Sequence, residues 1–129
     1  MIKLLLIFVV IAVFYFCECL IPYLHYEPGE DIEIRLGKQT VYKRQADNGI
    51  YHAFEVCNGK NAKICGFWYE EKTKKKVIGA AQTIQKGDNT LVLKNATEID
   101  SAWYYYPDGG NYIVIDIQKP IILKENQHK

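Results

Sequence analysis

The chain has 129 residues, of which 49% are hydrophobic and 24% are charged, and its formal net charge at pH 7 is +1. A chain of this length forms one domain that buries about two-thirds of its unfolded surface, enough for an independent core. A net charge so close to zero excludes a strong overall field that would steer the protein to nucleic acid or to an anionic membrane.

The N-terminal segment 1–19 has the pattern of a secretory signal peptide. Lys3 supplies a positive charge, Leu4–Phe16 is an unbroken apolar run, and Cys17-Glu18-Cys19 places small residues before a cleavage site after Cys19. A membrane anchor is the alternative, but a membrane span needs about 20 apolar residues and Glu18 ends this run early.

The mature chain is predicted to be residues 20–129, a single domain with its core at about 28–118. The tail Lys124–Lys129 is polar and carries neither a second hydrophobic segment nor a lipid-anchor signal. We therefore expect a secreted, extracellular protein with no membrane span after cleavage of the signal.

Short β-prone runs separated by turn residues fill this mature chain, which predicts an all-β sandwich. Ile32, Ile34 and Leu36 alternate with polar residues, as in a half-buried strand. The turn Ala46-Asp47-Asn48-Gly49 predicts a hairpin, because Asn-Gly tolerates positive φ. No helix is expected after residue 19. The predicted strands are 32–36, 40–45, 50–57, 64–70, 77–84, 90–94 and 112–118, with a further strand in the stretch 100–106.

Two cysteines, Cys57 and Cys65, remain in the mature chain after Cys17 and Cys19 leave with the signal. An even count in an oxidising compartment, with a turn-rich loop between the two residues, predicts a disulfide. Two thiols supply too few ligands for a structural zinc, and a C-x-x-C redox pair is absent from the sequence.

The run Asp100–Tyr106, together with Leu91–Leu93 before it, resembles the E strand, E–F corner and F strand of immunoglobulin-like domains. Pro28–Ile34 resembles the approach to strand B of the same superfamily. The resemblance implies an antiparallel β-sandwich in which the hydroxyl of Tyr104 folds back to upstream backbone and Asp100 holds the corner.

The usual inter-sheet disulfide of immunoglobulin domains is predicted to be missing, because its two positions fall near Leu36 and at Tyr106. Stability must then come from apolar packing and from the local cysteine bridge. The place of the strand-C tryptophan is taken by Tyr42, or by Trp68 if the strand lettering is shifted.

The order of elements is also similar to that of small secreted immunoglobulin-like proteins of nematodes. That similarity is carried by Val41–Arg44, Cys57, Cys65–Trp68, Thr90–Leu93 and the Tyr-Pro-Asp sequence ending at Asp108.

Strand alternation divides the aromatic residues near the C-terminus between two faces. If Tyr104 and Tyr106 face the core, their neighbours on the same strand face outward, beside the outward residues of the last strand. An exposed patch of this kind has the composition of a binding hot spot. The alternative is that neighbouring strands or the N-terminal segment cover it. The predicted partner-binding residues are Trp103, Tyr105, Tyr112 and Val114.

Two further features indicate surface chemistry. The run Lys72–Lys76 could hold a sulfated glycan, although Glu70 and Glu71 adjoin it, and a solvated loop is the alternative. Asn95-Ala96-Thr97 is an N-glycosylation sequon in a predicted loop, and the alternative is that Asn95 only makes turn hydrogen bonds.

Catalysis has no recognisable constellation in this sequence. The histidines are His25, His52 and His128, and no motif pairs His52, expected at the surface or half-buried, with a nucleophile. There is no glycine-rich phosphate loop and no metal-ligand spacing, so we expect neither cofactor nor metal. The sequence therefore predicts a non-catalytic module that binds an extracellular or cell-surface protein. A self-associating structural component is the alternative.

Overall fold

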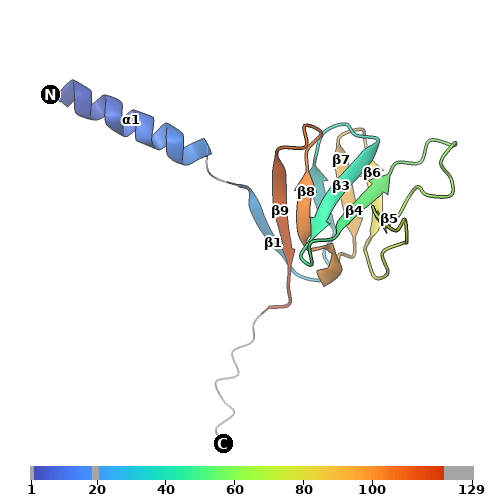
Figure 1. Ribbon diagram of the computed structural model, residues 1–129. Coiled ribbons are helices and arrows are strands. Elements are labelled where there is room, and N and C mark those ends of the chain that lie inside the picture. Colours follow the sequence, from blue (N-terminus) through green and yellow to red (C-terminus); the bar gives the residue numbers. More distant parts are fainter. Residues whose placement is uncertain (1, 19–20, 121–129) are drawn as a thin grey trace, which may run out of the picture.

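The computed structural model describes residues 2–18 and 21–120 of the chain. Helix α1 (Ile2–Glu18) corresponds to the apolar N-terminal run and extends away from the two sheets in Figure 1. In the described residues, no helix combines the length and the apolar character needed to cross a membrane. Cleavage after Cys19 stays a prediction, and the predicted polar tail and His128 lie outside the described residues.

Within residues 21–120, nine strands form two sheets that pack face to face (Figure 1). One sheet has six strands in the order β1-β9-β8-β3-β4-β5, and the other has three strands in the order β2-β7-β6. The strands are β1 (Tyr23–Tyr26), β2 (Ile32–Arg35), β3 (Val41–Ala46), β4 (Tyr51–Glu55), β5 (Trp68–Glu70), β6 (Gln82–Lys86), β7 (Thr90–Lys94), β8 (Ala102–Tyr105) and β9 (Tyr112–Ile117).

This strand order is that of an immunoglobulin-like sandwich. The strands β2, β7 and β6 correspond to B, E and D, and β9, β8 and β3 correspond to G, F and C. The added strands β4 and β5 extend the G-F-C sheet as C′ and C″ do in variable-type domains. The predicted all-β, immunoglobulin-like fold is therefore confirmed.

Two strand predictions differ from the structure. The strand expected at 64–70 is only Trp68–Glu70, because the disulfide loop continues through Gly66, whose φ is +82°. The strand expected at 77–84 begins later, at Gln82, because Gly79 turns the chain with a φ of +85°.

Strand β1 was not predicted. Its residues show no apolar alternation, and it exists because it pairs in parallel with the edge of β9. A short 3-10 turn, Glu98–Asp100, also stands where no helix was expected.

The core lies between the sheets and is built by the inward residues of alternating strands. Leu36 is fully buried and Tyr106 packs against the core, so apolar contacts occupy the positions of the usual inter-sheet cysteines. Tyr42 on β3 is also fully buried and lies 6.5 Å, ring to ring, from Phe54. Because β3 is strand C, Tyr42 takes the place of the strand-C tryptophan, and Trp68 belongs to β5.

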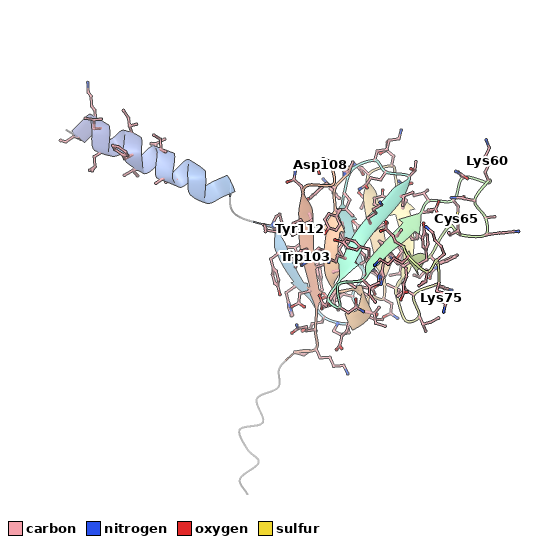
Figure 2. The ribbon with its side chains drawn as sticks, viewed as in Figure 1. Lys60, Cys65, Lys75, Trp103, Asp108 and Tyr112 are labelled. Atoms are coloured by element: carbon pink, nitrogen blue, oxygen red, sulfur yellow. A yellow bond between two sulfur atoms is a disulfide. The ribbon has the colours of Figure 1, made fainter. Side chains whose placement is uncertain are left out.

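Cys57 and Cys65 form the predicted disulfide, which closes the loop between β4 and β5 (Figure 2). Their Cα atoms are 5.0 Å apart. Within the loop, the side-chain amide of Asn61 donates a hydrogen bond to the carbonyl oxygen of Val56 at 3.0 Å. The bridge therefore constrains a surface loop rather than joining the two sheets.

Replacing both Cys57 and Cys65 with serine should lower the free energy of unfolding by about 2–3 kcal/mol, because the bridge restricts the unfolded chain by closing a short loop. Urea denaturation measures the change. The variant Lys60→Gln/Lys63→Gln alters the same loop without touching the bridge and should change this free energy by less than about 0.5 kcal/mol. An unchanged free energy in the serine variant would show that the bridge does not contribute to stability.

Candidate functional site

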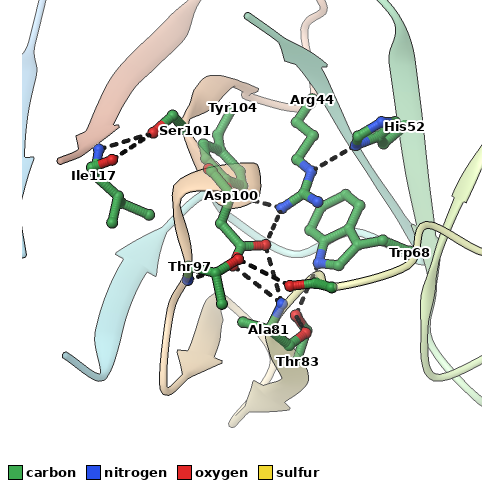
Figure 3. Close-up of polar contacts among 11 residues, drawn as sticks. Arg44, His52, Trp68, Ala81, Thr83, Thr97, Asp100, Ser101, Tyr104 and Ile117 are labelled. Atoms are coloured by element: carbon green, nitrogen blue, oxygen red, sulfur yellow. Dashed lines mark hydrogen bonds and ion pairs between the residues drawn. The ribbon is translucent and has the colours of Figure 1, made fainter. Parts of the chain in front are cut away.

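A buried ion pair and a tyrosine hydroxyl hold together the corner that precedes β8 (Figure 3). The hydroxyl of Tyr104 donates to the carbonyl oxygen of Asp100 at 2.6 Å. Arg44 Nη1 donates to Tyr104 Oη and to Asp100 Oδ1, both at 2.9 Å. All three side chains are fully buried.

Both oxygens of the Asp100 carboxylate accept hydrogen bonds. The backbone amide of Ala81 lies 3.1 and 3.0 Å from its two oxygens, and the backbone amide of Thr97 donates to Oδ2 at 2.9 Å. A buried charge is costly unless a partner charge and hydrogen bonds compensate it, and here both are present.

Arg44 is the residue of this corner that the sequence analysis missed. Its guanidinium carbon lies 4.0 Å from the centroid of the Trp68 ring, within the range of a cation–π contact. Strand alternation could have placed Arg44 inside, since it lies two residues after the buried Tyr42. An unpaired arginine, however, is rarely buried, and its partner Asp100 lies far away in the sequence.

His52 was expected at the surface or half-buried, and this expectation was wrong. The structure buries it on β4, where its Nδ1 accepts a hydrogen bond from Arg44 Nε at 3.1 Å. Burial, together with the nearby Arg44 charge, lowers the pKa of His52 to about 4. Burial also raises the pKa of Tyr104 to about 12. Near neutral pH the imidazole is therefore a neutral acceptor and the phenol a neutral donor.

The network beneath β8 fixes which residues face outward on that strand. Because Tyr104 points into the core, Trp103 and Tyr105 point to the outer side of the six-stranded sheet. The Trp103 ring stacks on Tyr112 of β9, with centroids 4.9 Å apart and planes 11° apart. Tyr105 contacts the same Tyr112 ring, with a centroid distance of 5.8 Å.

Cross-strand neighbours extend this surface across five strands. Val114 lies opposite both Tyr23 of β1 and Trp103 of β8, and Gln45 of β3 lies opposite both Trp103 and Tyr51 of β4. Strand β1 thus adds a ring to the surface instead of covering it. We call this surface the aromatic face. It consists of Tyr23, Tyr51, Trp103, Tyr105, Tyr112 and Val114.

The aromatic face is open to solvent at three large rings. Tyr23 is 61% exposed, Tyr51 45% and Trp103 42%, whereas Tyr105, Tyr112 and Val114 are half-buried between them. The half-buried members hold the exposed rings in place. The structure therefore brings together the four residues predicted for partner binding and adds Tyr23 and Tyr51.

Asp116 gives the aromatic face a polar margin. Its Oδ2 accepts a hydrogen bond from Tyr23 Oη at 2.8 Å and lies 3.4 Å from His25 Nδ1. The hydrogen bond to this carboxylate raises the pKa of Tyr23. The contacts also tie β1 to β9 through side chains, in addition to their backbone pairing.

Asn95, the sequon asparagine, is exposed directly after β7 and has a φ of +52°. The hydroxyl of Thr97 donates to the carbonyl oxygen of Gly79 at 2.8 Å. Strand β7 belongs to the three-stranded sheet, so a glycan on Asn95 would not stand on the strands that carry the aromatic face. Glycosylation of Asn95 stays a prediction.

Comparison with known proteins identifies no family for this chain. No protein-family model matches it. No curated protein matches its sequence. The similarity to small secreted nematode proteins therefore stays a prediction.

A search of solved structures finds similarity to the extracellular domain of the voltage-gated sodium channel beta4 subunit, described as parallel homodimers that explain a role in cell–cell adhesion. It is 13% identical, with a TM-score of 0.41, and the match covers 82% of this chain and 92% of that one. A similarity this low carries no argument about the fold or the function of this chain.

Substituting Tyr104→Phe should lower the free energy of unfolding by about 1–3 kcal/mol, because the carbonyl oxygen of Asp100 and a donor of Arg44 would lose their buried partner. Urea denaturation measures this loss. Tyr23→Phe removes a hydroxyl from an exposed ring and should cost less than about 0.5 kcal/mol. Equal effects of the two substitutions would mean that the corner does not depend on its buried hydroxyl.

The free energy of unfolding should fall as the pH is lowered from about 6.5 to about 4. The folded pKa of His52, about 4, lies below the ordinary value of 6.5, so the unfolded chain binds a proton that the folded chain excludes. The stability that the neutral imidazole of His52 contributes is fully present above about pH 6.5 and is lost as the pH falls toward about 4. Urea denaturation at several pH values in this range measures the free energy of unfolding. This free energy should fall less steeply with pH in the variant His52→Asn, whose amide oxygen can still accept a hydrogen bond from Arg44. An identical pH dependence in the two proteins would contradict the assignment of the effect to His52.

Proposed function

We propose that the protein is a secreted, non-catalytic binding module that recognises an extracellular or cell-surface protein through the aromatic face. The observation that carries this proposal is the row of exposed aromatic rings, centred on Trp103, across the six-stranded sheet. Tryptophan and tyrosine are enriched at the energetic centres of protein interfaces, where they fill apolar pockets of the partner.

The packing of the rings favours tight binding. Trp103 and Tyr112 already stack on each other in the free protein, and Tyr105 packs beside them. Side chains that are ordered before association lose less conformational entropy when they bind. Asp116 and His25 at one end supply the polar margin that an interface needs for specificity.

Three observations support the non-catalytic and extracellular parts of the proposal. The titratable groups whose pKa values are shifted furthest, His52, Tyr69 and Tyr104, are all nearly fully buried, and each is engaged in a hydrogen bond within the protein. The disulfide between Cys57 and Cys65 is typical of proteins that mature in an oxidising compartment. The apolar helix α1 fits the role of a secretion signal.

Self-association through the same surface is the second candidate function. The central row of the aromatic face, from Tyr23 through Trp103 to Tyr51, carries no charged side chain. Two copies could therefore approach without repulsion between like charges, and each could bury the rings of the other.

A binding screen against extracellular and cell-surface proteins tests the proposal. The double variant Trp103→Ala/Tyr105→Ala should weaken binding to the partner at least about 30-fold, because hot-spot residues each cost about 2 kcal/mol or more when truncated. The matched control is Ile78→Ala/Ile84→Ala, which removes exposed apolar side chains outside the aromatic face. Binding should be unchanged in this control.

Unfolding curves of the double variant decide whether the face is functional or structural. A variant that stays folded and loses the partner supports the proposal, whereas a variant that unfolds shows that these rings belong to the core. Light scattering over a concentration series separates the two candidates. Growth of dimers in the unmodified protein, abolished by the double variant, would favour self-association over a different partner.

A further inference from the structure

Six lysines gather on two loops at the β5 end of the sandwich. The disulfide-closed loop between β4 and β5 carries Lys60 and Lys63, and the loop between β5 and β6 carries the other four. Figure 2 shows Lys60, Cys65 and Lys75 on this side of the molecule, opposite β1 and α1. We call this surface the lysine edge. It consists of Lys60, Lys63, Lys72, Lys74, Lys75 and Lys76.

The two acidic residues within the sequence of the lysine edge, Glu70 and Glu71, have other partners. Glu71 Oε1 pairs with Lys43 Nζ on β3 at 3.1 Å, and Glu70 Oε2 accepts a hydrogen bond from the Thr73 hydroxyl at 2.9 Å. The ion pairs found among the described residues include none of the six lysines. The sequence had suggested that these glutamates partly neutralise the run, and the structure directs Glu71 away from it.

The charge of the chain is therefore unevenly distributed. Residues 57–77 contain six lysines and two glutamates, a net charge of +4. Because the whole chain carries +1, the remaining residues carry −3. The near-neutral total conceals a cationic end, which attracts anions locally even though the molecule as a whole does not.

Several contacts hold the lysine edge in place before any ligand binds. Lys74 Nζ lies 5.2 Å from the centroid of the Tyr69 ring, and Lys76 Nζ lies 5.6 Å from that of Phe67. The backbone amide of Lys74 donates to the carbonyl oxygen of Glu70 at 2.8 Å. The disulfide constrains the other loop. This order lowers the entropy lost on binding.

We propose that the lysine edge is a second binding site, independent of the aromatic face, for a sulfated polysaccharide. Lysine ammonium groups are compact point charges, suited to successive sulfates on a flexible polyanion. An array of such contacts gains affinity by releasing counterions, as proteins do on other polyanions.

The arrangement favours a sulfated polysaccharide over a single-stranded nucleic acid. Proteins that bind single strands combine cations with free aromatic rings on which bases stack. Here Tyr69 is only 4% exposed, and the ammonium groups of Lys74 and Lys76 stand over the rings of Tyr69 and Phe67. The disulfide in this same edge indicates maturation in the oxidising compartments that lead to the cell surface.

Binding of heparin to the protein expressed from its full sequence tests this proposal. The variant with glutamine at Lys72, Lys74, Lys75 and Lys76 should raise the Kd for heparin at about 0.15 M salt by about tenfold or more. The slope of log Kd against the logarithm of the salt concentration should also decrease by about 0.7 for each lysine that no longer pairs with a sulfate. The matched control changes four lysines elsewhere, Lys38, Lys86, Lys94 and Lys119, to glutamine and should leave both quantities nearly unchanged.

A second variant tests the part played by the disulfide loop. Lys60→Gln/Lys63→Gln should also raise the Kd for heparin, by less than the four-lysine variant, if both loops contact one chain. Equal loss of affinity in the four-lysine variant and its control would overturn the proposal, because net charge alone would then explain binding. Equal affinity for single-stranded DNA or for anionic lipid vesicles would overturn the assignment to a sulfated polysaccharide.

The aromatic-face variant separates this site from the proposed function. Trp103→Ala/Tyr105→Ala should bind heparin with unchanged affinity, since these residues lie on β8 and not on the two loops. Loss of heparin binding in that variant, while it remains folded, would show that the lysine edge is not an independent site. Desulfated heparin should bind much more weakly than heparin, and equal binding of the two would exclude recognition of sulfate.

Discussion

The buried pair of Arg44 and Asp100 is the constraint on which the rest of this structure depends. It joins β3 to the 3-10 turn before β8, and its oxygens also fix the backbone amide of Ala81 ahead of β6. A charge in the core is tolerated only where a partner and donors surround it, so few other arrangements of these segments are acceptable. The hydroxyl of Tyr104 completes the network and closes the corner.

This internal network determines the outer surface through the geometry of a strand. Successive side chains on β8 point to opposite sides, so the inward position of Tyr104 sets Trp103 and Tyr105 outward. Their neighbours across the sheet, Tyr112 and Tyr51, then complete a surface of rings. The placement of the exposed rings thus depends on a polar network buried in the core.

Most immunoglobulin domains have a disulfide that joins the two sheets, whereas the disulfide of this protein closes a surface loop. Leu36 and Tyr106 fill the usual inter-sheet positions with apolar contacts, and the arginine–aspartate pair adds a polar connection through the core. The disulfide is placed at the lysine edge, where it orders an exposed loop. The two surfaces are therefore supported by two separate features of the structure, as the proposal of two independent binding sites requires.

The sequence by itself determined the features that depend on near neighbours. Alternation predicted β2 and β9, the Asn-Gly turn predicted the β3–β4 hairpin, and the cysteine count predicted the bridge. Only the tertiary structure decided that Arg44 and His52 are buried, that β1 pairs with β9, and that Glu71 turns from the lysines toward Lys43. The burial of Arg44, the pairing of β1 and the direction of Glu71 each depend on a partner distant in the sequence. Local hydrophobicity classes a charged side chain as exposed, whereas its burial depends on the charge and donors that the fold brings to it.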